Sequence, residues 1–244
     1  MTLRTISRAA GIVSRRFGRP ELLAAIDRDV LRGQRELLAI RVALTSWLRS
    51  SSMYVDVGVN RGQFLADAIR IAPGGSHLAF EPIPHLASAV SRRWPQVDCR
   101  ALALGAVPGE AEFCHFTKMD GWSGLRRQPE VSTHRGGPEL IRVTVSTLDS
   151  EIGDARPTVV KIDVEGGEFD VLRGGMRVLS ELRPVVVFEH ERGPAGLYGT
   201  PPQEPWDLLT SLDYRIFAIT GEGPFSRYQF AQASDVVNWL ATPA

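Results

Sequence analysis

Four acidic residues follow short apolar segments that have the composition of buried strands: Asp56, Glu81, Asp163 and Glu189. In an open parallel sheet the carboxyl ends of the strands lie along one edge, and ligands bind in the crevice outside that edge. A carboxylate at that edge can hold the hydroxyl groups of a ribose, and it can also accept a proton from a substrate. These residues therefore predict a nucleoside-binding site with a general base beside it.

The stretch over residues 54–64, YVDVGVNRGQF, has the form of a strand that turns into a helix. A dinucleotide-binding turn, G-x-G-x-x-G, offers bare backbone amides to a pyrophosphate. Here Asn60 occupies the place of the second glycine between Gly58 and Gly62, and the charge of Asp56 would repel a pyrophosphate. This pattern disfavours an NAD-dependent oxidoreductase and favours a ligand with an ammonium group and no phosphate, such as the methionine half of S-adenosylmethionine. The structural alternative is a tight turn in which Asn60 caps the helix that follows.

Strand-like and helix-like segments alternate from residue 53 onward, which is typical of a parallel sheet with helices on both faces. We expect one such α/β domain over residues 51–244, preceded by a helical extension over residues 1–50. Residues 117–140, rich in Gly, Pro, Ser, Thr and charge, predict a long loop that acts as a lid. The expected strands are 53–57, 77–80, 97–104, 110–116, 141–145, 158–162, 184–188, 214–219 and 236–240; the expected helices are 21–48, 63–71, 85–93, 168–179 and 206–212, with a loop over 192–205.

The net charge of the 244-residue chain is zero, but the charge is unevenly distributed. Residues 1–49 hold ten arginines against four acids, a balance of +6, so the remainder carries −6. A basic amphipathic N-terminal segment suits peripheral contact with an anionic membrane surface or with nucleic acid, and a solvated helical face is the plainer interpretation. The acidic body and the lack of an N/D-P-P-Y-type motif argue against nucleic acid as the substrate.

The composition gives no support to membrane spans or disulfides. No apolar run approaches the roughly 20 residues that a membrane-spanning helix needs, and the first residues lack the apolar core of a secretory signal. Two cysteines, Cys99 and Cys114, are too few for a disulfide framework or a zinc site. Arginine outnumbers lysine 26 to 2, which is typical of a GC-rich bacterial genome. We therefore expect a protein of the bacterial cytoplasm, with membrane association through its N-terminus as the alternative.

Five short motifs follow one another along the chain: VDVGVNRGQF at 55–64, FEP at 80–82, ALG at 103–105, STLD at 146–149 and KIDVEGGE at 161–168. Together they resemble the FkbM family of S-adenosylmethionine-dependent methyltransferases over roughly residues 53–190, with a weaker match at NWLATP, 238–243. The KIDVEG element with the upstream TLD is the most specific part of this resemblance. The glycine turn is not specific by itself.

The resemblance implies a class I methyltransferase fold: a Rossmann-like, seven-stranded sheet with its last strand antiparallel and helices on both faces. It also implies S-adenosylmethionine as the cofactor and methyl transfer, usually to oxygen, on a sugar, a glycolipid or another secondary metabolite. Carried over by position, the glycine turn frames the methionine moiety, Glu81 takes the ribose, residues 101–103 meet the adenine and Asp163 lies beside the sulfonium. Gly167 departs from the family motif, which usually has alanine there. The implied cofactor-binding residues are Asp56, Gly58, Asn60, Gly62, Glu81, Pro82, Ala101, Leu102, Ala103 and Asp163.

Transfer of a methyl group to a hydroxyl needs a base or a metal, because an alcohol is a poor nucleophile until its proton leaves. We expect Asp163, Glu189 and His190 to supply this chemistry, and we expect no metal ion. In the lid, Trp122, Ser123 and His134 are candidate contacts to the acceptor. An exposed Trp stacks well on a sugar face, but it can equally fix the lid to the core.

Structural roles compete with these catalytic ones. Lys161 points to the same side of its strand as Asp163, and a lysine buried in an apolar strand needs a partner, for which we expect Glu189. Glu165 and Glu168 are expected to cap the helix that follows them. The third functional class that the sequence allows is a cofactor-binding partner subunit without catalysis. The sequence is also compatible with a homo-oligomer.

Overall fold

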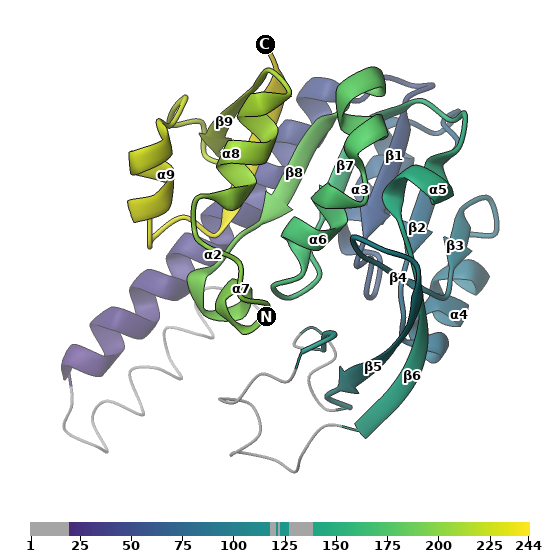
Figure 1. The fold of residues 1–244 in the computed structure, drawn as a ribbon, viewed down its shortest axis with the longest axis horizontal. Coiled ribbons are helices and arrows are strands. Elements are labelled where there is room, and N and C mark those ends of the chain that lie inside the picture. Colours follow the sequence, from purple (N-terminus) through teal and green to yellow (C-terminus); the bar gives the residue numbers. More distant parts are fainter. Residues whose placement is uncertain (1–19, 118–120, 122, 127–138) are drawn as a thin grey trace.

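The computed structural model describes residues 20–117, 121, 123–126 and 139–244, and in the first helix it describes side chains from residue 31 onward. Its centre is a seven-stranded sheet in the order β3-β2-β1-β7-β8-β10-β9 (Figure 1). In this sheet β10 runs antiparallel to both β8 and β9, and the other pairs are parallel. The expected class I methyltransferase topology, with the last strand reversed, is thus confirmed. The strands are β1 (Met53–Val57), β2 (Leu78–Phe80), β3 (Asp98–Arg100), β7 (Pro157–Ile162), β8 (Val185–Glu189), β9 (Tyr214–Ala218) and β10 (Asn238–Pro243).

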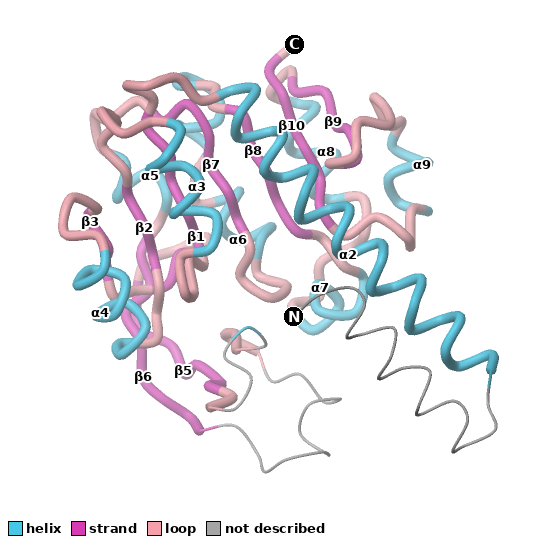
Figure 2. Tube along the Cα trace, turned by 180° about the vertical axis from the view of Figure 1, so that it is seen from behind, coloured by secondary structure: helices cyan, strands magenta, loops and turns pink. Residues whose placement is uncertain are grey.

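Helices cover both faces of this sheet, which is why β7 and β8 are apolar along almost their whole length (Figures 1 and 2). One face buries side chains of α2 (Pro20–Trp47), α3 (Gln63–Ile71) and α4 (Pro84–Arg93). The other face packs against α5 (Leu148–Ile152), α6 (Glu168–Arg173), a π-helical turn η3 (Val178–Leu182), α8 (Glu204–Ser211) and α9 (Arg227–Gln232). Among the described helices, none combines the length and apolarity that crossing a bilayer requires.

A second, three-stranded sheet lies beside the carboxyl edge of the first. It consists of β4 (Ala103–Leu104), β6 (Glu139–Ser146) and β5 (Gly109–His115), in that order. The expected third strand over 97–104 is therefore wrong as a single strand, because the chain turns where the Leu102 N–H donates to the Arg100 carbonyl at 3.0 Å. β3 stays in the main sheet, and β4 pairs with β6 instead.

Two helical assignments from the sequence also need correction. The expected helix over 168–179 ends at Arg173, because a Cβ atom on Gly174 would lie 2.1 Å from the Gly105 carbonyl oxygen. Two backbone segments touch at this point, so the helix is interrupted and the chain continues as η3. The expected loop over 192–205 contains the short helix α7 (Arg192–Leu197).

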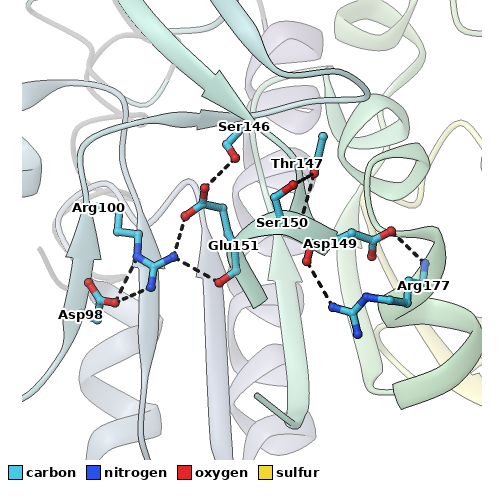
Figure 3. Close-up of polar contacts among 8 residues, drawn as sticks. All are labelled: Asp98, Arg100, Ser146, Thr147, Asp149, Ser150, Glu151 and Arg177. Carbon is cyan, nitrogen blue, oxygen red and sulfur yellow. Dashed lines mark hydrogen bonds and ion pairs between the residues drawn. The ribbon is translucent and has the colours of Figure 1, made fainter. Parts of the chain in front are cut away.

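The STLD motif links the small sheet to the helices behind it (Figure 3). Thr147 caps α5 by accepting a hydrogen bond from the Ser150 N–H at 3.2 Å. The Asp149 carboxylate accepts from the N–H groups of Arg177 and Val178 at 2.9 and 2.8 Å, which satisfies the start of η3. The motif is therefore structural.

Glu151, also on α5, connects this helix to β3 and to the end of β6. It accepts from the Arg100 guanidinium at 2.5 Å and from the Ser146 hydroxyl at 2.5 Å, while Arg100 also pairs with Asp98 on β3 (Figure 3). The network fixes the place where the chain leaves the main sheet, between β3 and β4. Since β4 contributes to the pocket described next, these contacts hold one wall of the site.

Candidate active site

A pocket opens at the carboxyl edge of the main sheet, between the ends of β1, β2 and β7 and the small sheet. Its empty space, including solvent at the open mouth, is about 730 Å³. Its walls are largely apolar and carry a few acids. Of the expected cofactor residues, the pocket is lined by Gly58, Asn60, Glu81, Pro82, Leu102, Ala103 and Asp163.

The glycine turn depends on backbone conformations that few residues adopt. The φ angles are +82° at Gly58, +50° at Asn60 and +75° at Gly62, in the left-handed region that favours glycine and, less strongly, asparagine. A Cβ atom on Gly58 would lie 1.8 Å from the Asp163 carbonyl oxygen, and one on Gly62 would lie 2.4 Å from the Trp94 ring. Gly62 therefore shapes the turn from outside the pocket wall.

Glu81 lies at the end of β2, and backbone amides hold both of its carboxylate oxygens. The Asn60 N–H donates to Oε2 at 2.8 Å, and the Ile83 N–H donates to Oε1 at 2.9 Å. The residue is 4% exposed, so its orientation is fixed. Its carboxylate accepts the hydrogen bond of the Asn60 amide, which a pyrophosphate would otherwise need. The side chain also lines the pocket. An acid at this position also binds the ribose in dinucleotide sites, so it is the engaged Asn60 amide, and not the charge of Glu81, that disfavours a dinucleotide.

Asp56 is absent from the described pocket wall, contrary to the sequence-based expectation. Side chains alternate along a strand, so Tyr54 and Asp56 point towards α2 and α3 and the turn begins only after Val57. Asp56 is in register with Lys161, whose Nζ lies 3.9 Å from Oδ1. Burial raises the pKa of Asp56 to about 6, and the nearby lysine charge limits that rise.

Lys161 forms its short ion pair with Asp163, and the expected pairing with Glu189 is wrong. Nζ donates to Asp163 Oδ2 at 2.8 Å, because residues two apart in a strand point to the same side. The side chain of Lys161 is 4% exposed and that of Asp163 is 34% exposed. Burial would lower the pKa of Lys161, but the charges of Asp163 and Asp56 hold it above its ordinary value.

Asp163 and Glu189 form a hydrogen-bonded carboxyl pair. The residues before them, Ile162 and Phe188, are in register across β7 and β8, which brings the two side chains together. Burial and the charge of Asp163 raise the pKa of Glu189 well above its ordinary value. Burial alone would raise the pKa of Asp163 too, but Lys161 and the bond from Glu189 hold it below its ordinary value. Within the pair, Asp163 therefore loses its proton more readily than Glu189, which retains a proton to higher pH.

A model of the methyltransferase FkbM domain matches residues 56–216, well over half of the chain. The chain belongs to the FkbM methyltransferase family. Methyltransferase 1 of Beauveria bassiana is 28% identical over 144 residues, covering 50% of this chain and 58% of that protein. The AMB antimetabolite synthetase AmbE of Pseudomonas aeruginosa is 26% identical over 183 residues, covering 59% of this chain and 9% of that protein. The chain thus spans less than two thirds of either relative.

One solved structure supports the fold of this FkbM domain. The crystal structure of the methyltransferase FkbM from Methylobacillus flagellatus KT gives a TM-score of 0.51 at 19% identity, covering 80% of this chain and 44% of that chain. The sequence-based resemblance and the class I fold are both confirmed.

S-adenosylmethionine is the cofactor of this family, and the residues of the FkbM pocket fit it. Glu81 presents a fixed carboxylate for ribose hydroxyls, and the apolar segment 102–104 offers a surface for adenine. Ala101 does not line the pocket with its neighbours, whereas Leu104 and Ile83 do. The glycine turn has no row of bare amides for phosphate, which agrees with a cofactor that has none.

His190 lies on the other face of the sheet from Glu189, because consecutive strand residues point to opposite faces. Its ring stacks on Phe230 with centroids 5.5 Å apart, and Nε2 lies 3.1 Å from the Pro202 carbonyl oxygen. Burial lowers the pKa of His190. His190 therefore packs against α9 and does not line the described pocket. It is not part of the carboxyl pair of Asp163 and Glu189.

The described residues of the expected lid fold back onto β5. The Cys114 N–H donates to the Gly124 carbonyl at 2.8 Å, and Ser123 Oγ accepts from the Phe116 N–H at 3.0 Å. Gly121, Ser123 and Leu125 then line the pocket, and β6 already begins at Glu139. Trp122 and His134 lie outside the described residues.

Sequence reasoning missed Tyr198, which lines the pocket from the end of α7. The stretch around it has turn-like composition, so no periodic signal marked it. A Cβ atom on Gly167 would lie 3.3 Å from the Tyr198 ring. The glycine that departs from the family motif thus leaves room for this ring against the start of α6. Phe113, on β5, is a second lining residue that the sequence did not indicate.

The loop between β7 and α6 is held by Glu168, at the end of KIDVEGGE. Its Oε1 accepts from the N–H groups of Val164 and Gly166 at 2.8 and 3.1 Å. Glu168 is 1% exposed, and burial raises its pKa to about 7. The expected capping of α6 by Glu165 and Glu168 is wrong: the N-cap residue is Gly167, without a side-chain cap hydrogen bond, and Glu168 binds the amides of the preceding loop instead.

Three carboxylates cluster at the edge of the FkbM pocket: Asp163, Glu165 and Glu189 each place one oxygen within 4.8 Å of the other two. Hard oxygen ligands at such spacing suit a divalent cation, and acidic groups also gather without one. His190, which the sequence grouped with Asp163 and Glu189, is not part of this cluster. That transfer needs no metal stays a prediction.

Proposed function

We propose that this protein is an S-adenosylmethionine-dependent O-methyltransferase, and that its acceptor is a hydroxyl of a sugar, a glycolipid or another secondary metabolite. The observation that carries this proposal is the carboxyl pair of Asp163 and Glu189 at the edge of the cofactor pocket. Asp163 lines the pocket and is one-third exposed there. A carboxylate in that place suits an acceptor whose proton must leave before it reacts.

The pocket residues have different proposed roles, which follow from their positions. When bound, the cofactor supplies an electrophilic methyl group. Glu81 and the glycine turn hold the two ends of the cofactor, so that the acceptor approaches from the side of Asp163. Asp163 accepts the hydroxyl proton, and Lys161 keeps it ionised until then. Glu189 adds a hydrogen bond that orients Asp163. Alignment and proton removal are the two contributions that such a displacement needs.

The lid and the wall opposite the cofactor are proposed to select the acceptor. Ser123 and Tyr198 bring hydroxyl groups to a wall that is otherwise mostly apolar. Such a mixture suits an acceptor with an apolar part and a few polar groups.

A pair of matched variants tests the proton acceptor. Asp163→Asn removes the carboxylate, and we expect turnover to fall by about 100-fold or more while S-adenosylhomocysteine binding stays within a few-fold of the wild type. Asp170→Asn is the control, because Asp170 also lines the pocket but lies on α6, away from the carboxyl pair. Equal turnover of Asp163→Asn and wild type would remove Asp163 from the mechanism.

Calorimetry and product analysis test the reaction class. We expect S-adenosylhomocysteine to bind and NADH not to bind, because Glu81 bonds the Asn60 amide. Incubation with a panel of hydroxylated, amino and thiol acceptors should give a methoxy signal in the product. NADH binding would favour an oxidoreductase. Cofactor binding without turnover on any acceptor class would favour a non-catalytic subunit, and N- or S-methyl products would overturn transfer to oxygen.

A further inference from the structure

Two carboxylates share the buried ammonium group of Lys161. Nζ lies 2.8 Å from Asp163 Oδ2 and 3.9 Å from Asp56 Oδ1, and the side chains of Lys161 and Asp56 are only 4% and 2% exposed. Lys161 and Asp56 are in register on β7 and β1, and Asp163 follows two residues later, so all three side chains lie on the face that α2 and α3 cover. Asp163 alone balances the charge of the lysine. Asp56 is therefore a second buried acid, in excess of what the resting site needs.

The charged side chains of the helices that cover this lysine have partners of their own. Asp67 on α3 pairs with Arg41 on α2 at 2.8 Å, and Glu36 on α2 accepts from Asn238 Nδ2 at 2.8 Å. The ring of Phe64 on α3 has its centroid 5.2 Å from the ammonium nitrogen, and an aromatic face attracts a cation without neutralising it. The acids that balance the lysine charge are therefore those on and just after the strands.

The lysine loses its close anion during the proposed reaction. When Asp163 accepts the hydroxyl proton, its carboxylate becomes neutral. Burial raises the pKa of Glu189 whether or not Asp163 is charged, so Glu189 retains its own proton to higher pH. Glu165, in the loop after β7, is partly exposed, so water screens its charge. A buried ammonium group without an anion tends to lose its proton, and a neutral lysine would no longer favour the release of the proton from Asp163.

Asp56 is placed to be ionised at that moment. Its Oδ1, which faces the lysine, accepts no hydrogen bond from the described residues, and the ammonium group needs to move by only about 1 Å to bond it. Burial raises the pKa of Asp56 to about 6 and the charge of Asp163 adds to the rise, whereas Lys161 lowers it. Once Asp163 is neutral, its repulsion disappears and the pKa of Asp56 falls. Protonation of one acid thus strengthens the ionisation of the other.

We propose that Asp56 is a positioning residue that keeps Lys161 charged while Asp163 carries the hydroxyl proton. The retained ammonium charge then favours the carboxylate form of Asp163 again, and the proton leaves to water through its side chain, which is 34% exposed. This inference deepens the proposed function and rests on it, since it takes Asp163 as the proton acceptor. Asp56 acts through Lys161, which agrees with its absence from the described pocket wall.

Titration of the lysine side chains by NMR tests this role, because the chain has two lysines, Lys118 and Lys161. The full chain labelled with ¹³C-lysine gives one set of signals for each, and Lys118→Arg identifies that of Lys161. A neutral-pair variant, which carries Asp163→Asn and Glu189→Gln, represents the carboxyl pair with both of its members uncharged. All titrations are recorded in EDTA, without an acceptor and without turnover.

In the neutral-pair variant we expect Lys161 to titrate above about pH 9. Addition of Asp56→Asn should lower its proton affinity by about 100-fold or more, because the ammonium group then has no close carboxylate. Addition of Glu165→Gln instead is the control, since Glu165 lies beside the pair but is partly exposed, and it should change the affinity by less than about threefold. With Asp163 intact, Asp56→Asn should leave Lys161 charged up to about pH 10.

Equal titration midpoints with and without Asp56→Asn in the neutral-pair variant would overturn the proposal, as would a fall caused by Glu165→Gln. A second pair of variants applies if the combined variant does not fold. In Lys161→Met, Asp56 is a buried acid without its cation, so addition of Asp56→Asn should raise the urea midpoint at pH 8, and a further loss of stability would overturn the pairing. Because neither measurement uses turnover, a failure of this inference is observed separately from a failure of O-methyl transfer.

Discussion

Lys161 Nζ lies 2.8 Å from Asp163 Oδ2 and 3.9 Å from Asp56 Oδ1, so one buried ammonium group bridges an acid in the pocket wall and an acid behind the sheet. The lysine holds the pKa of Asp163 below its ordinary value against the opposite effect of burial. Asp56, by contrast, has a pKa raised to about 6 by burial. The lysine thus keeps Asp163 ionised, as the role proposed for Asp163 as proton acceptor requires.

Replacement of Lys161 by methionine should change the pH profile of methyl transfer. In the wild type Asp163 stays ionised at mildly acidic pH, so the rate should be flat there. Without the lysine, only the hydrogen bond from Glu189 opposes the effect of burial, so the pKa of Asp163 rises, and the rate should fall as the pH is lowered from about 8 to about 5. A pH profile of kcat measures this. A uniform loss at every pH, with an unchanged profile, would show that Lys161 serves packing only.

Replacement of Glu81 by alanine should weaken cofactor binding. The change removes the pocket carboxylate and leaves the N–H groups of Asn60 and Ile83 without their acceptor, so the affinity for S-adenosylhomocysteine should fall by about 30-fold or more. Calorimetry measures the change, and Glu110→Ala, at an exposed position on β5, is the control. Unchanged affinity in Glu81→Ala would contradict the assignment of this pocket to the cofactor.

Replacement of Glu168 by glutamine should remove part of the pH dependence of folding. The folded-state pKa is raised from an ordinary 4.5 to about 7, so the stabilising contribution is present at low pH and is lost as the pH rises through 7. Both loop amides donate to one oxygen, Oε1, which glutamine retains. Relative to the wild type, the variant should gain about 2 kcal/mol in free energy of unfolding between about pH 5 and pH 8. Urea unfolding at the two pH values measures this, and parallel behaviour of both proteins would contradict it.

Chelation tests the cluster of Asp163, Glu165 and Glu189. We expect methyl transfer to continue in EDTA, because Lys161 already pairs with Asp163 and the raised pKa of Glu189 favours a proton on that residue. The measurement is turnover before and after chelation. Loss of turnover in EDTA, restored by magnesium, would show that a cation replaces this proton and that the three carboxylates are its ligands.

Much of the fold follows from local sequence signals. Apolar strands such as β7 and β8 stand out because helices cover both sides, and the amphipathic α3 was predicted with its observed bounds, residues 63–71. The failures occur where distant backbone segments meet. The break after Arg173 depends on Gly105, which is far away in sequence, and the second sheet depends on pairing between β4 and β6 across the lid. Neither contact leaves a periodic pattern.

For the site, the sequence by itself determined the types of residue and their order: a glycine turn with Asn60, an acid after the second strand, and KIDVEGGE after a buried strand. Those features follow from short-range chemistry, so they identified the family. Only the tertiary structure decided which side each residue faces. It turned Asp56 and His190 away from the pocket, because side chains alternate along strands. It also joined Asp163 to Lys161 and Glu189 and brought Tyr198 against Gly167, since burial and proximity arise only when the strands pair.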